Sequence, residues 1–450
     1  MISKNSKIEI VVDDFSHDGK GVAHYEDYVI FINNAIKGEK LEIKLIKILE
    51  KKRLAFGIIT KILKKSPNRI ELKCLHKRCG GCQLQHLDYK AQLDFKKGVV
   101  EAAIKRIAKI DDIKIYPPIG MALPCHYRNK NSMPIGKTNK KAVLGFYAVR
   151  SHEIIPIEEC MIQPEINNSI LKVVKNWIDD FRISIYNETN FNGKLRHLVI
   201  REGDDEIMVA LVSRVKNISN LKELIERLTN LSPKIKSILV NINPTKGNRI
   251  LGDITNVIFG KNHITNRLGT LEFDIKLDTF FQINNLQTEV LYNKAIDLAN
   301  ISKEDTVIDS YCGVGSLTLF LAQKAKKVIG FEIVENSILQ ARANATKNKI
   351  DNVEFVLGDV EKILPKWQQE NSSYDILFID PPRKGAPQQF WDSVIKSSPK
   401  KILYISCYPA TLARDLNYLK EFGYIAKKIK PIDMFPHTFH IETITLIEKV

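Results

Sequence analysis

The sequence lacks a hydrophobic run long enough to cross a lipid bilayer. Its longest stretch without a charged residue is 14 residues, Ser310 to Gln323, whereas a transmembrane helix needs about 20 apolar residues. The N-terminal residues lack the apolar core of a signal peptide and lead directly into a strand-like pattern. We therefore expect neither a membrane protein nor a secreted one, and we predict a cytoplasmic location.

Cysteine is scarce, and its distribution does not suit a disulfide framework. The 450 residues include seven cysteines, an odd number, and Cys74, Cys79 and Cys82 lie within nine residues. This pattern favours a reducing compartment in which thiols bind metals or act in catalysis. Two glycines between Cys79 and Cys82 let the loop fold around a metal, and Cys160 is the natural fourth ligand. Four cysteines can bind zinc or an iron–sulfur cluster, and the spacing does not decide between them.

Acidic residues are too few to balance the basic ones. Against 68 Lys and Arg there are 52 Asp and Glu, which gives a formal net charge of +16. Residues 51–80 alone carry ten Lys or Arg and a single acid, Glu71, so this segment contributes +9 (ten minus one). A basic surface of this kind favours a polyanionic partner, of which nucleic acid is the commonest.

The first 62 residues have the pattern of a small antiparallel barrel. Short alternating runs predict strands over residues 8–12, 28–32, 40–46 and 55–60. The Asp18-Gly19 pair supplies the backbone conformation of a tight turn. Four or five short strands are typical of an OB-like barrel, which is a common platform for RNA.

The chain is predicted to form three domains. We assign residues 1–62 to the OB-like barrel, 63–265 to a central α+β domain with the four-cysteine site, and 266–450 to a doubly wound α/β domain. In the last part, strand-like runs alternate with helical ones. The strands are expected at 306–309, 327–332, 353–356, 374–380, 401–406 and 442–448. A helix at about 90–110 is expected to pack on this domain.

A glycine turn after the first of these strands predicts an adenosine-containing ligand. Gly313 and Gly315 let the backbone approach a ligand closely, and Glu332 ends the next strand, where an acid can bind both ribose hydroxyls. NAD, FAD and S-adenosylmethionine fit this pattern, but Thr318 replaces the third glycine of the dinucleotide fingerprint. Asp380-Pro-Pro forms a rigid loop after the fourth strand, as in many base methyltransferases. We therefore predict S-adenosylmethionine as the cofactor.

Two cysteines, Cys312 and Cys407, precede helices in this domain, with Thr411 as the expected N-cap of the second helix. A helix N-terminus favours thiolate over thiol, and Cys407 is preferred because the Pro-Pro loop is its neighbour in the sheet. A thiolate that adds to carbon 6 of uracil makes carbon 5 nucleophilic enough to attack a methyl group. A base must then remove the carbon 5 proton. The candidate bases are His437, His440 and Glu442.

Five motifs together resemble those of the RNA (uracil-5-)-methyltransferases, and the resemblance covers essentially the whole chain. The motifs are Cys79-Gly-Gly-Cys-Gln-Leu-Gln-His86, Phe280-Phe-Gln-Ile-Asn284, Asp380-Pro-Pro-Arg-Lys-Gly385, Ser406-Cys-Tyr-Pro-Ala-Thr-Leu-Ala-Arg-Asp415 and Phe435-Pro-His-Thr-Phe-His-Ile-Glu442. The resemblance implies that the N-terminal barrel is a TRAM domain. It also implies a Rossmann-like methyltransferase domain at the C-terminus that uses S-adenosylmethionine.

The same resemblance implies roles for individual residues. Cys407 is implied to be the nucleophile, Glu442 the general base, and Phe280 the ring that stacks on a flipped-out uracil. The residues implied to contact S-adenosylmethionine are Gln282, Tyr311, Glu332 and Asp380. The cysteines implied to hold a 4Fe-4S cluster are Cys74, Cys79, Cys82 and Cys160.

The barrel and the cysteine site also bear on the RNA substrate. By resemblance, the tRNA branch of the family lacks both features, which points to the 23S rRNA branch. We therefore expect a monomeric enzyme that methylates carbon 5 of uridine in 23S rRNA. One alternative is the same reaction on the T-loop of tRNA. The other is a metal-cluster RNA-binding protein without methyltransferase activity.

Overall fold

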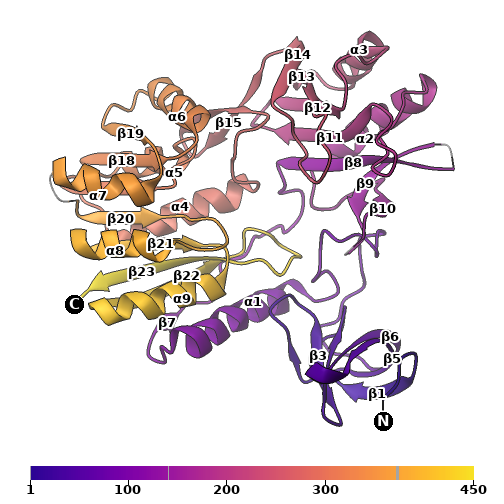
Figure 1. The fold of residues 1–450 in the computed structure, drawn as a ribbon, viewed down its shortest axis with the longest axis horizontal. Helices are drawn as coiled ribbons and strands as arrows, with labels where there is room; N and C mark the ends of the chain where they lie inside the picture. Colours follow the sequence, from indigo (N-terminus) through magenta and orange to yellow (C-terminus); the bar gives the residue numbers. More distant parts are fainter. Residues whose placement is uncertain (1, 140, 150, 371–373) are drawn as a thin grey trace.

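The computed structural model describes residues 2–139, 141–149, 151–370 and 374–450, so Met1 of the predicted barrel lies outside the described residues. These residues form a six-stranded, a seven-stranded and an eight-stranded sheet and a two-stranded hairpin. Figure 1 shows the first sheet at the lower right, the second at the upper right and the third at the left. Within the described ranges, no helix combines the length and the apolar character needed to cross a membrane.

The N-terminal sheet has the strand order β1-β5-β6-β4-β3-β2. Its strands are β1 (Lys7–Val11), β2 (Asp14–Phe15), β3 (Gly21–Tyr25), β4 (Tyr28–Ile32), β5 (Lys40–Leu49) and β6 (Leu54–Lys64). Alternate residues of β4 and β5 face the core, and Ile30, Ile32, Leu41 and Ile43 are fully buried. The sheet curls so that β1 also contacts β3. The predicted barrel is thus confirmed, except that β4 and β6 pair in parallel rather than antiparallel.

A buried ion pair anchors the segment that leaves the barrel. Arg69 Nε lies 2.5 Å from Glu39 Oε1, and Arg69 Nη2 lies 2.7 Å from Glu39 Oε2. The Glu39 carboxylate also accepts hydrogen bonds from the backbone N–H groups of Ile36 and Ser66. Breaking a buried pair of this kind costs about 3–5 kcal/mol. One of the ten basic residues in 51–80 therefore serves the fold.

The central sheet has the order β10-β9-β8-β11-β12-β13-β14. Its elements are β8 (Lys130–Thr138), β9 (Lys141–Tyr147), β10 (Ile154–Pro156), α2 (Glu165–Asp180), β11 (Leu195–Glu202), β12 (Ile207–Ser213), α3 (Leu221–Leu231), β13 (Ile235–Ile242) and β14 (Ile254–Gly260). Helices α2 and α3 share one core with this sheet. Met208 and Leu239 belong instead to a core that also contains Phe273 of the hairpin, β15 (His263–Leu268) and β16 (Leu271–Lys276), and Leu291 from the C-terminal region. The central and C-terminal regions therefore share buried apolar surface.

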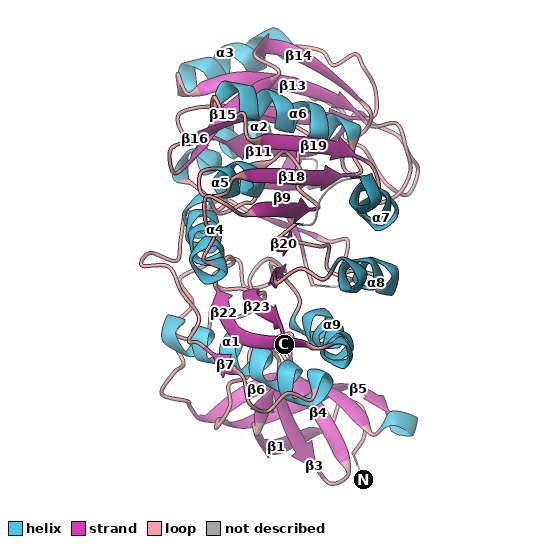
Figure 2. Cartoon of the chain, turned by 90° about the vertical axis from the view of Figure 1, so that its left-hand side faces the viewer, coloured by secondary structure: helices cyan, strands magenta, loops and turns pink. Residues whose placement is uncertain are grey.

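The C-terminal sheet has the order β19-β18-β17-β20-β21-β23-β22-β7. Its strands are β7 (Lys114–Ile115), β17 (Thr306–Ser310), β18 (Lys327–Glu332), β19 (Val353–Leu357), β20 (Ile376–Ile379), β21 (Lys401–Ser406), β22 (Tyr424–Ile432) and β23 (Glu442–Lys449). Its helices are α4 (Asn285–Ala299), α5 (Ser316–Ala322), α6 (Glu335–Lys347), α7 (Val360–Glu370), α8 (Gln388–Ser397) and α9 (Pro409–Leu419). Figure 2 shows α4 and α5 on one side of this sheet and α7, α8 and α9 on the other. Successive residues Val307 and Ile308 accordingly enter two different cores. The predicted doubly wound α/β fold is confirmed.

Helix α1 (Tyr89–Ala103) lies early in the sequence but packs with the C-terminal sheet. It continues as a π-helical turn over Ile104–Ala108. Val100 and Ile104 share a core with Leu412 of α9, and β7 then pairs in parallel with β22. Residues 89–115 therefore link the N-terminal half of the chain to the sheet that carries the site.

The strand order places three loops together at one edge of the sheet. Strands β17, β18, β20 and β21 are parallel, and the chain crosses from β19 to the other side of β17 to form β20. Ligands of open α/β sheets bind beyond the carboxyl ends of the strands at such a switch point. Tyr311, Asp380 and Cys407 are the first residues after β17, β20 and β21, respectively.

Candidate active site

Cys407 and Glu442 lie side by side at this edge. Strand β23 is antiparallel to β21, and Ser406 pairs with Thr443, so the residue after β21 meets the residue that opens β23. Cys407 is half-buried and Glu442 is buried. Burial, followed by the negative charges of Glu442 and Asp380, raises the pKa of Cys407 to about 12, against the opposing charge of Arg383. The thiol and the two carboxyl groups therefore lie within electrostatic range of one another.

The local structure around Cys407 differs from the prediction in one respect. The N-cap of α9 is Tyr408 rather than Thr411, and Pro409 takes the first helical position, where its missing N–H is no loss. Thr411 Oγ1 instead donates to the Tyr408 carbonyl at 3.0 Å. The helix end was expected to favour the thiolate, but burial and two nearby carboxylates outweigh it and raise the pKa of Cys407.

The carboxyl groups at the site are poised to hold protons. Burial, followed by the charge of Asp380, raises the pKa of Glu442 well above its usual range. Burial also raises the pKa of Asp380 to about 7. A carboxylate with a raised pKa is a stronger base than one in water. In its deprotonated form, Glu442 is therefore a strong proton acceptor near the Cys407 thiol.

The second candidate thiol, Cys312, is a core residue. It is 6% exposed and belongs to the hydrophobic cluster beneath β17. Its sulfur lies so near Gly330 that a Cβ at that position would be 2.9 Å away. Burial raises the pKa of Cys312 well above its usual value. Cys312 thus behaves as a small apolar side chain. The structure therefore distinguishes Cys312 from Cys407, although both precede a helix in the sequence.

The two histidines of the 435–442 motif have different surroundings. His437 is buried, and both ring nitrogens have partners: Nδ1 lies 3.2 Å from Gln92 Nε2, and Nε2 lies 2.9 Å from the Pro124 carbonyl. His440 lies 3.5 Å from Arg383 Nη2. Burial and the charge of Arg383 lower the pKa of His440 to about 4. Of the three predicted bases, Glu442 has the carboxylate chemistry and an electrostatic effect on Cys407.

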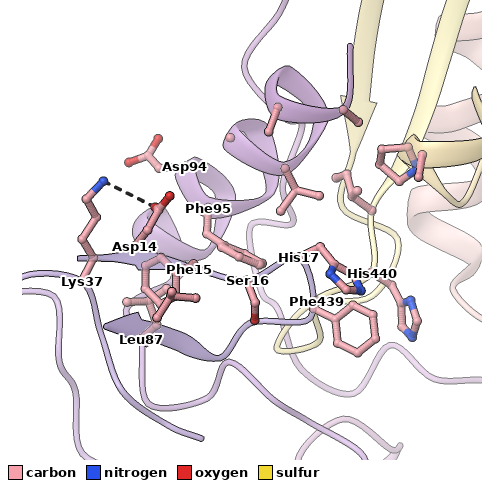
Figure 3. Close-up of a pocket in the computed structure, with 18 of the residues that line it drawn as sticks. Asp14, Phe15, Ser16, His17, Lys37, Leu87, Asp94, Phe95, Phe439 and His440 are labelled. Atoms are coloured by element: carbon pink, nitrogen blue, oxygen red, sulfur yellow. Dashed lines mark ion pairs between the residues drawn. The ribbon is translucent and has the colours of Figure 1, made fainter. Parts of the chain in front are cut away.

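A cavity of about 930 Å³ opens beside Cys407. Its walls come from the N-terminal barrel, from α1 and from the Cys407 and His440 loops. Figure 3 shows His17 of the barrel region near Phe439 and His440, and Phe15 beside Phe95 and Leu87. The cavity is within the size range of ligand sites in proteins, about 300–1,000 Å³. The candidate nucleophile thus faces a space that the barrel helps to enclose.

A second cavity of about 540 Å³ lies at the ends of β17 and β18 and includes Tyr311 and Glu332. The Glu332 carboxylate accepts hydrogen bonds from the backbone N–H groups of Gly313 (3.1 Å) and Val334 (2.9 Å). Gly315 has a φ of +80°, and a Cβ there would lie 3.1 Å from the Phe355 ring. The glycine turn is therefore required for this geometry and orients Glu332 toward the cavity.

The other predicted cofactor residues lie outside the walls of this second cavity. Asp380 follows β20 and interacts with Glu442. Gln282 precedes α4, and its backbone carbonyl accepts a hydrogen bond from Asn129 Nδ2 at 2.9 Å. Two further acids of the cavity wall, Asp359 and Glu361, follow β19.

Arg383 is a residue of the site whose role sequence reasoning missed. Its positive charge lowers the pKa values of Cys407 and Glu442 and so favours their charged forms. It stands in the Asp380-Pro-Pro-Arg motif, which singled out the loop but not the side chain. The sequence signal for the role of Arg383 was a basic residue in the loop predicted to lie next to the candidate thiolate.

The four predicted metal ligands come from two parts of the chain. The backbone of Cys79 pairs with that of Ala148 in an isolated antiparallel β-bridge beside the β9–β10 turn. This pairing brings the 74–82 loop near Cys160. Burial, with smaller effects from the charges of the other three thiols, raises the pKa of Cys82 to about 12. The four thiols therefore lie in one region of the protein.

Near two of these thiols, Cys79 and Cys160, backbone N–H groups favour the charged form of the sulfur. The backbone N–H of Gly81 lies 3.4 Å from Cys79 Sγ. The backbone N–H groups of Ile162 and Gln163 oppose the rise in the pKa of Cys160 that burial causes. Hydrogen bonds to sulfur of this kind are a feature of iron–sulfur sites. Across the described ranges, however, no three Cys, His, Asp or Glu side chains are gathered closely enough to form a metal-binding group, so the cluster remains a prediction.

Two protein-family models match the chain. The model of the tRNA (uracil-5-)-methyltransferases matches residues 88–450, and the model of the TRAM domain matches residues 3–59. The first match includes the candidate active site and α1, and the second covers nearly all of the barrel. The resemblance found in the motifs is therefore confirmed.

Full-length relatives carry RNA methyltransferase names. An uncharacterized RNA methyltransferase of Bacillus cereus is 43% identical over 100% of this chain and 98% of its own length. Another, from Clostridium acetobutylicum, is also 43% identical over 100% of this chain and 98% of its length. The names of these relatives do not specify which RNA the proteins modify.

A solved structure resembles the fold over nearly its whole length. The tRNA (uracil-54, C5)-methyltransferase of Pyrococcus abyssi, crystallised with S-adenosyl-L-homocysteine, has a TM-score of 0.79 and 27% sequence identity. The match covers 98% of this chain and 100% of that chain, so it extends over the N-terminal barrel. The barrel therefore does not separate rRNA enzymes from tRNA enzymes, contrary to the expectation from the motifs.

Proposed function

The chain belongs to the tRNA (uracil-5-)-methyltransferase family, and from this premise we propose that it transfers a methyl group from S-adenosylmethionine to carbon 5 of a uridine in 23S rRNA. The observation that carries the chemistry is the placement of Cys407 directly after β21 and of Glu442 at the start of β23, next to the paired residues Ser406 and Thr443 and within electrostatic range of each other. Family membership limits the reaction to RNA uracil C5 methylation.

In the proposed reaction, Cys407 acts first. Its thiol proton passes to the Asp380 carboxylate, and Arg383 stabilises the resulting thiolate. The sulfur then forms a bond to carbon 6 of uracil, and the electron pair of the C5=C6 bond moves to the carbonyl oxygen on carbon 4. Carbon 5 becomes an enolate carbon that can attack an electrophile.

Glu442 completes the reaction. S-adenosylmethionine supplies an electrophilic methyl group, whose bond to sulfur breaks as carbon 5 takes the methyl. The Glu442 carboxylate then removes the proton from carbon 5, and the electron pair of that C–H bond restores the C5=C6 double bond. Cys407 leaves as the thiolate. Its raised pKa makes it a poorer leaving group, so a well-placed base is essential.

The surfaces around the two cavities support binding of RNA and cofactor. Phe280 is 70% exposed, which supports its proposed role as a ring that stacks on an extruded base. Tyr311 and Glu332 line the second cavity, and we propose that with Gln282 and Asp380 they bind S-adenosylmethionine. We also propose a cytoplasmic monomer with domains at 1–62, 63–265 and 266–450.

We further propose a 4Fe-4S cluster on the four cysteines. The charges of Cys74 and Cys160 contribute to the raised pKa values of Cys79 and Cys82, and thiolates are the ligands that such clusters require. A side chain at Gly80 would place its Cβ 3.0 Å from the Tyr147 carbonyl. The lack of a side chain at Gly80 therefore supports close approach of the cysteine loop to β9.

The RNA substrate has a second candidate. The four-cysteine site supports 23S rRNA, whereas the full-length likeness to an archaeal tRNA (uracil-54, C5)-methyltransferase favours tRNA. Purified protein should be given labelled S-adenosylmethionine and either unmodified 23S rRNA or unmodified tRNA, and 5-methyluridine should be measured in each. We expect 5-methyluridine in the rRNA at a rate at least tenfold higher. The opposite ratio would assign the tRNA reaction instead.

A further inference from the structure

The loop between β22 and β23, residues 433–441, is held by an unusual series of hydrogen bonds. Five successive backbone carbonyls each accept one from a distant part of the chain. The pairs are Asp433 with Gln287 Nε2 (3.0 Å), Met434 with Asn284 Nδ2 (3.0 Å), Phe435 with Lys96 Nζ (3.1 Å), Pro436 with Tyr127 Oη (3.0 Å) and His437 with the Leu84 N–H (2.9 Å). Irregular backbone usually bonds to water at such groups. In this loop, all five carbonyls are instead hydrogen-bonded to other groups of the protein.

Lys96 is the charged member of the series. Its Nζ lies 2.5 Å from Asp433 Oδ1, and both side chains are 0% exposed. Tyr89 Oη donates to the other carboxylate oxygen of Asp433 at 2.9 Å and accepts from the Met121 N–H at 2.8 Å. Buried ion pairs contribute little net stability, because desolvation offsets their attraction. Their best-attested value lies in fixing one arrangement of the chain.

One face of α1 presents these groups to the loop. Tyr89, Gln92 and Lys96 follow the i, i+3, i+7 spacing of a single helical face. Gln92 Oε1 accepts from the His437 N–H at 3.0 Å, and His437 has a φ of +68°, which a non-glycine residue rarely adopts. The helix therefore fixes Asp433 at the start of the loop and His437 in its strained middle.

The fixed loop ends at the proposed base. Beyond His437 it continues to His440 and then to Glu442 at the start of β23. We propose that Lys96 is a positioning residue for uracil methylation: by holding Asp433 and the Phe435 carbonyl, it sets the loop so that Glu442 reaches the proton on carbon 5. This proposal rests on the proposed function of Glu442. Lys96 itself does not contact the reacting atoms.

Replacing Lys96 with Met should slow the last step of the reaction selectively. Cys407 attack and methyl transfer do not require Glu442 to be aligned with carbon 5, whereas release of the methylated RNA does. A covalent protein–RNA adduct should therefore form at the wild-type rate and decay about 100-fold more slowly, as expected for a base displaced by about 1 Å. The adduct is measured with labelled RNA on denaturing gels after quenching at successive times.

The matched control is Lys97→Met. Lys97 is the next residue of α1, and it pairs with Glu101 on the helix surface rather than with the loop. This variant should release RNA at the wild-type rate. Equal slowing in both variants would show a general effect on α1 and would overturn the proposal.

A double variant guards against misfolding, because Lys96→Met alone leaves a buried carboxylate without its partner. Lys96→Met with Asp433→Asn removes both charges, and it should keep the wild-type melting temperature and affinity for S-adenosylmethionine but release RNA slowly. Wild-type release by this variant, or joint loss of cofactor binding and adduct formation, would overturn the positioning role. Failure of the proposed function is distinguishable, because the wild-type protein would then form no adduct and no 5-methyluridine.

Discussion

At the scale of single residues, the reactivity of Cys407 depends on three charged neighbours. Asp380 and Glu442 raise its pKa, and Arg383 lowers it. The resting protein therefore holds a thiol rather than a thiolate at neutral pH. Far below the pKa, the thiolate fraction rises about tenfold for each pH unit, so attack on uracil should accelerate through the neutral and mildly alkaline range.

Substitutions of Asp380 and of Arg383 should shift the pKa of Cys407 in opposite directions. Asp380→Asn removes a negative charge and lowers the pKa of Cys407, so alkylation by iodoacetamide at pH 8 should be about tenfold faster. Arg383→Met should slow it by a similar factor, since one nearby charge shifts a pKa by about one unit or more. The rate is measured by mass spectrometry of the Cys407 peptide without RNA or cofactor.

The control for this experiment is Asp375→Asn, because Asp375 lies before β20, at the opposite end of the strand that Asp380 follows. It should leave the alkylation rate unchanged. An unchanged rate with Asp380→Asn would show that burial alone sets the pKa and that the carboxylate does not act on the thiol.

At the scale of elements, the β9–β10 turn lies beside the 74–82 loop, and we propose that four cysteines of these segments hold a 4Fe-4S cluster. We expect purified protein, prepared without oxygen, to contain iron and to show a visible absorption band that dithionite bleaches. Cys160→Ser should lose this band because one of four ligands is missing. Cys125→Ser is the matched control, since Cys125 lies outside the set. Colourless wild-type protein with stoichiometric zinc would contradict the iron–sulfur assignment.

The elements also show how far the sequence could predict this site. Cys407 and Glu442 were identified from motifs, and the strands that carry them from their apolar runs. Strand β22 was missed because its pairing with β23 shifts register between Ala426 and Lys428, which breaks the alternation of buried and exposed residues. The Lys96–Asp433 pair could not be predicted, because periodicity carries no information on contacts between residues so far apart.

At the scale of the whole molecule, the basic segment 51–80 links the barrel to the cysteine loop. Its residues do not all serve one purpose, since Arg69 pairs with Glu39 and Arg78 with Glu153. Lys61, Lys64 and Lys65 are exposed at the end of β6. These three lysines are therefore the better candidates for contacts with the RNA backbone.

Reversal of these three charges should weaken RNA binding and leave the cofactor site intact. Lys61→Glu, Lys64→Glu and Lys65→Glu together should reduce the slope of log affinity against log salt concentration by about 2, because fewer counterions are released. Affinities are measured by fluorescence anisotropy over a salt series. The control changes the same charge at the opposite edge of the C-terminal sheet, with Lys324, Lys326 and Lys349 replaced by Glu. Equal weakening by both triple variants would indicate a long-range effect of net charge rather than a contact.

The central claim concerns which thiol performs the chemistry, and methyl incorporation into RNA tests it most directly. The assay of 23S rRNA and tRNA described above should be run with wild-type protein, Cys407→Ala and Cys312→Ala. We predict 5-methyluridine with the wild-type protein, a reduced but measurable amount with Cys312→Ala, and none above background with Cys407→Ala. Incorporation at the wild-type rate by Cys407→Ala would contradict the account.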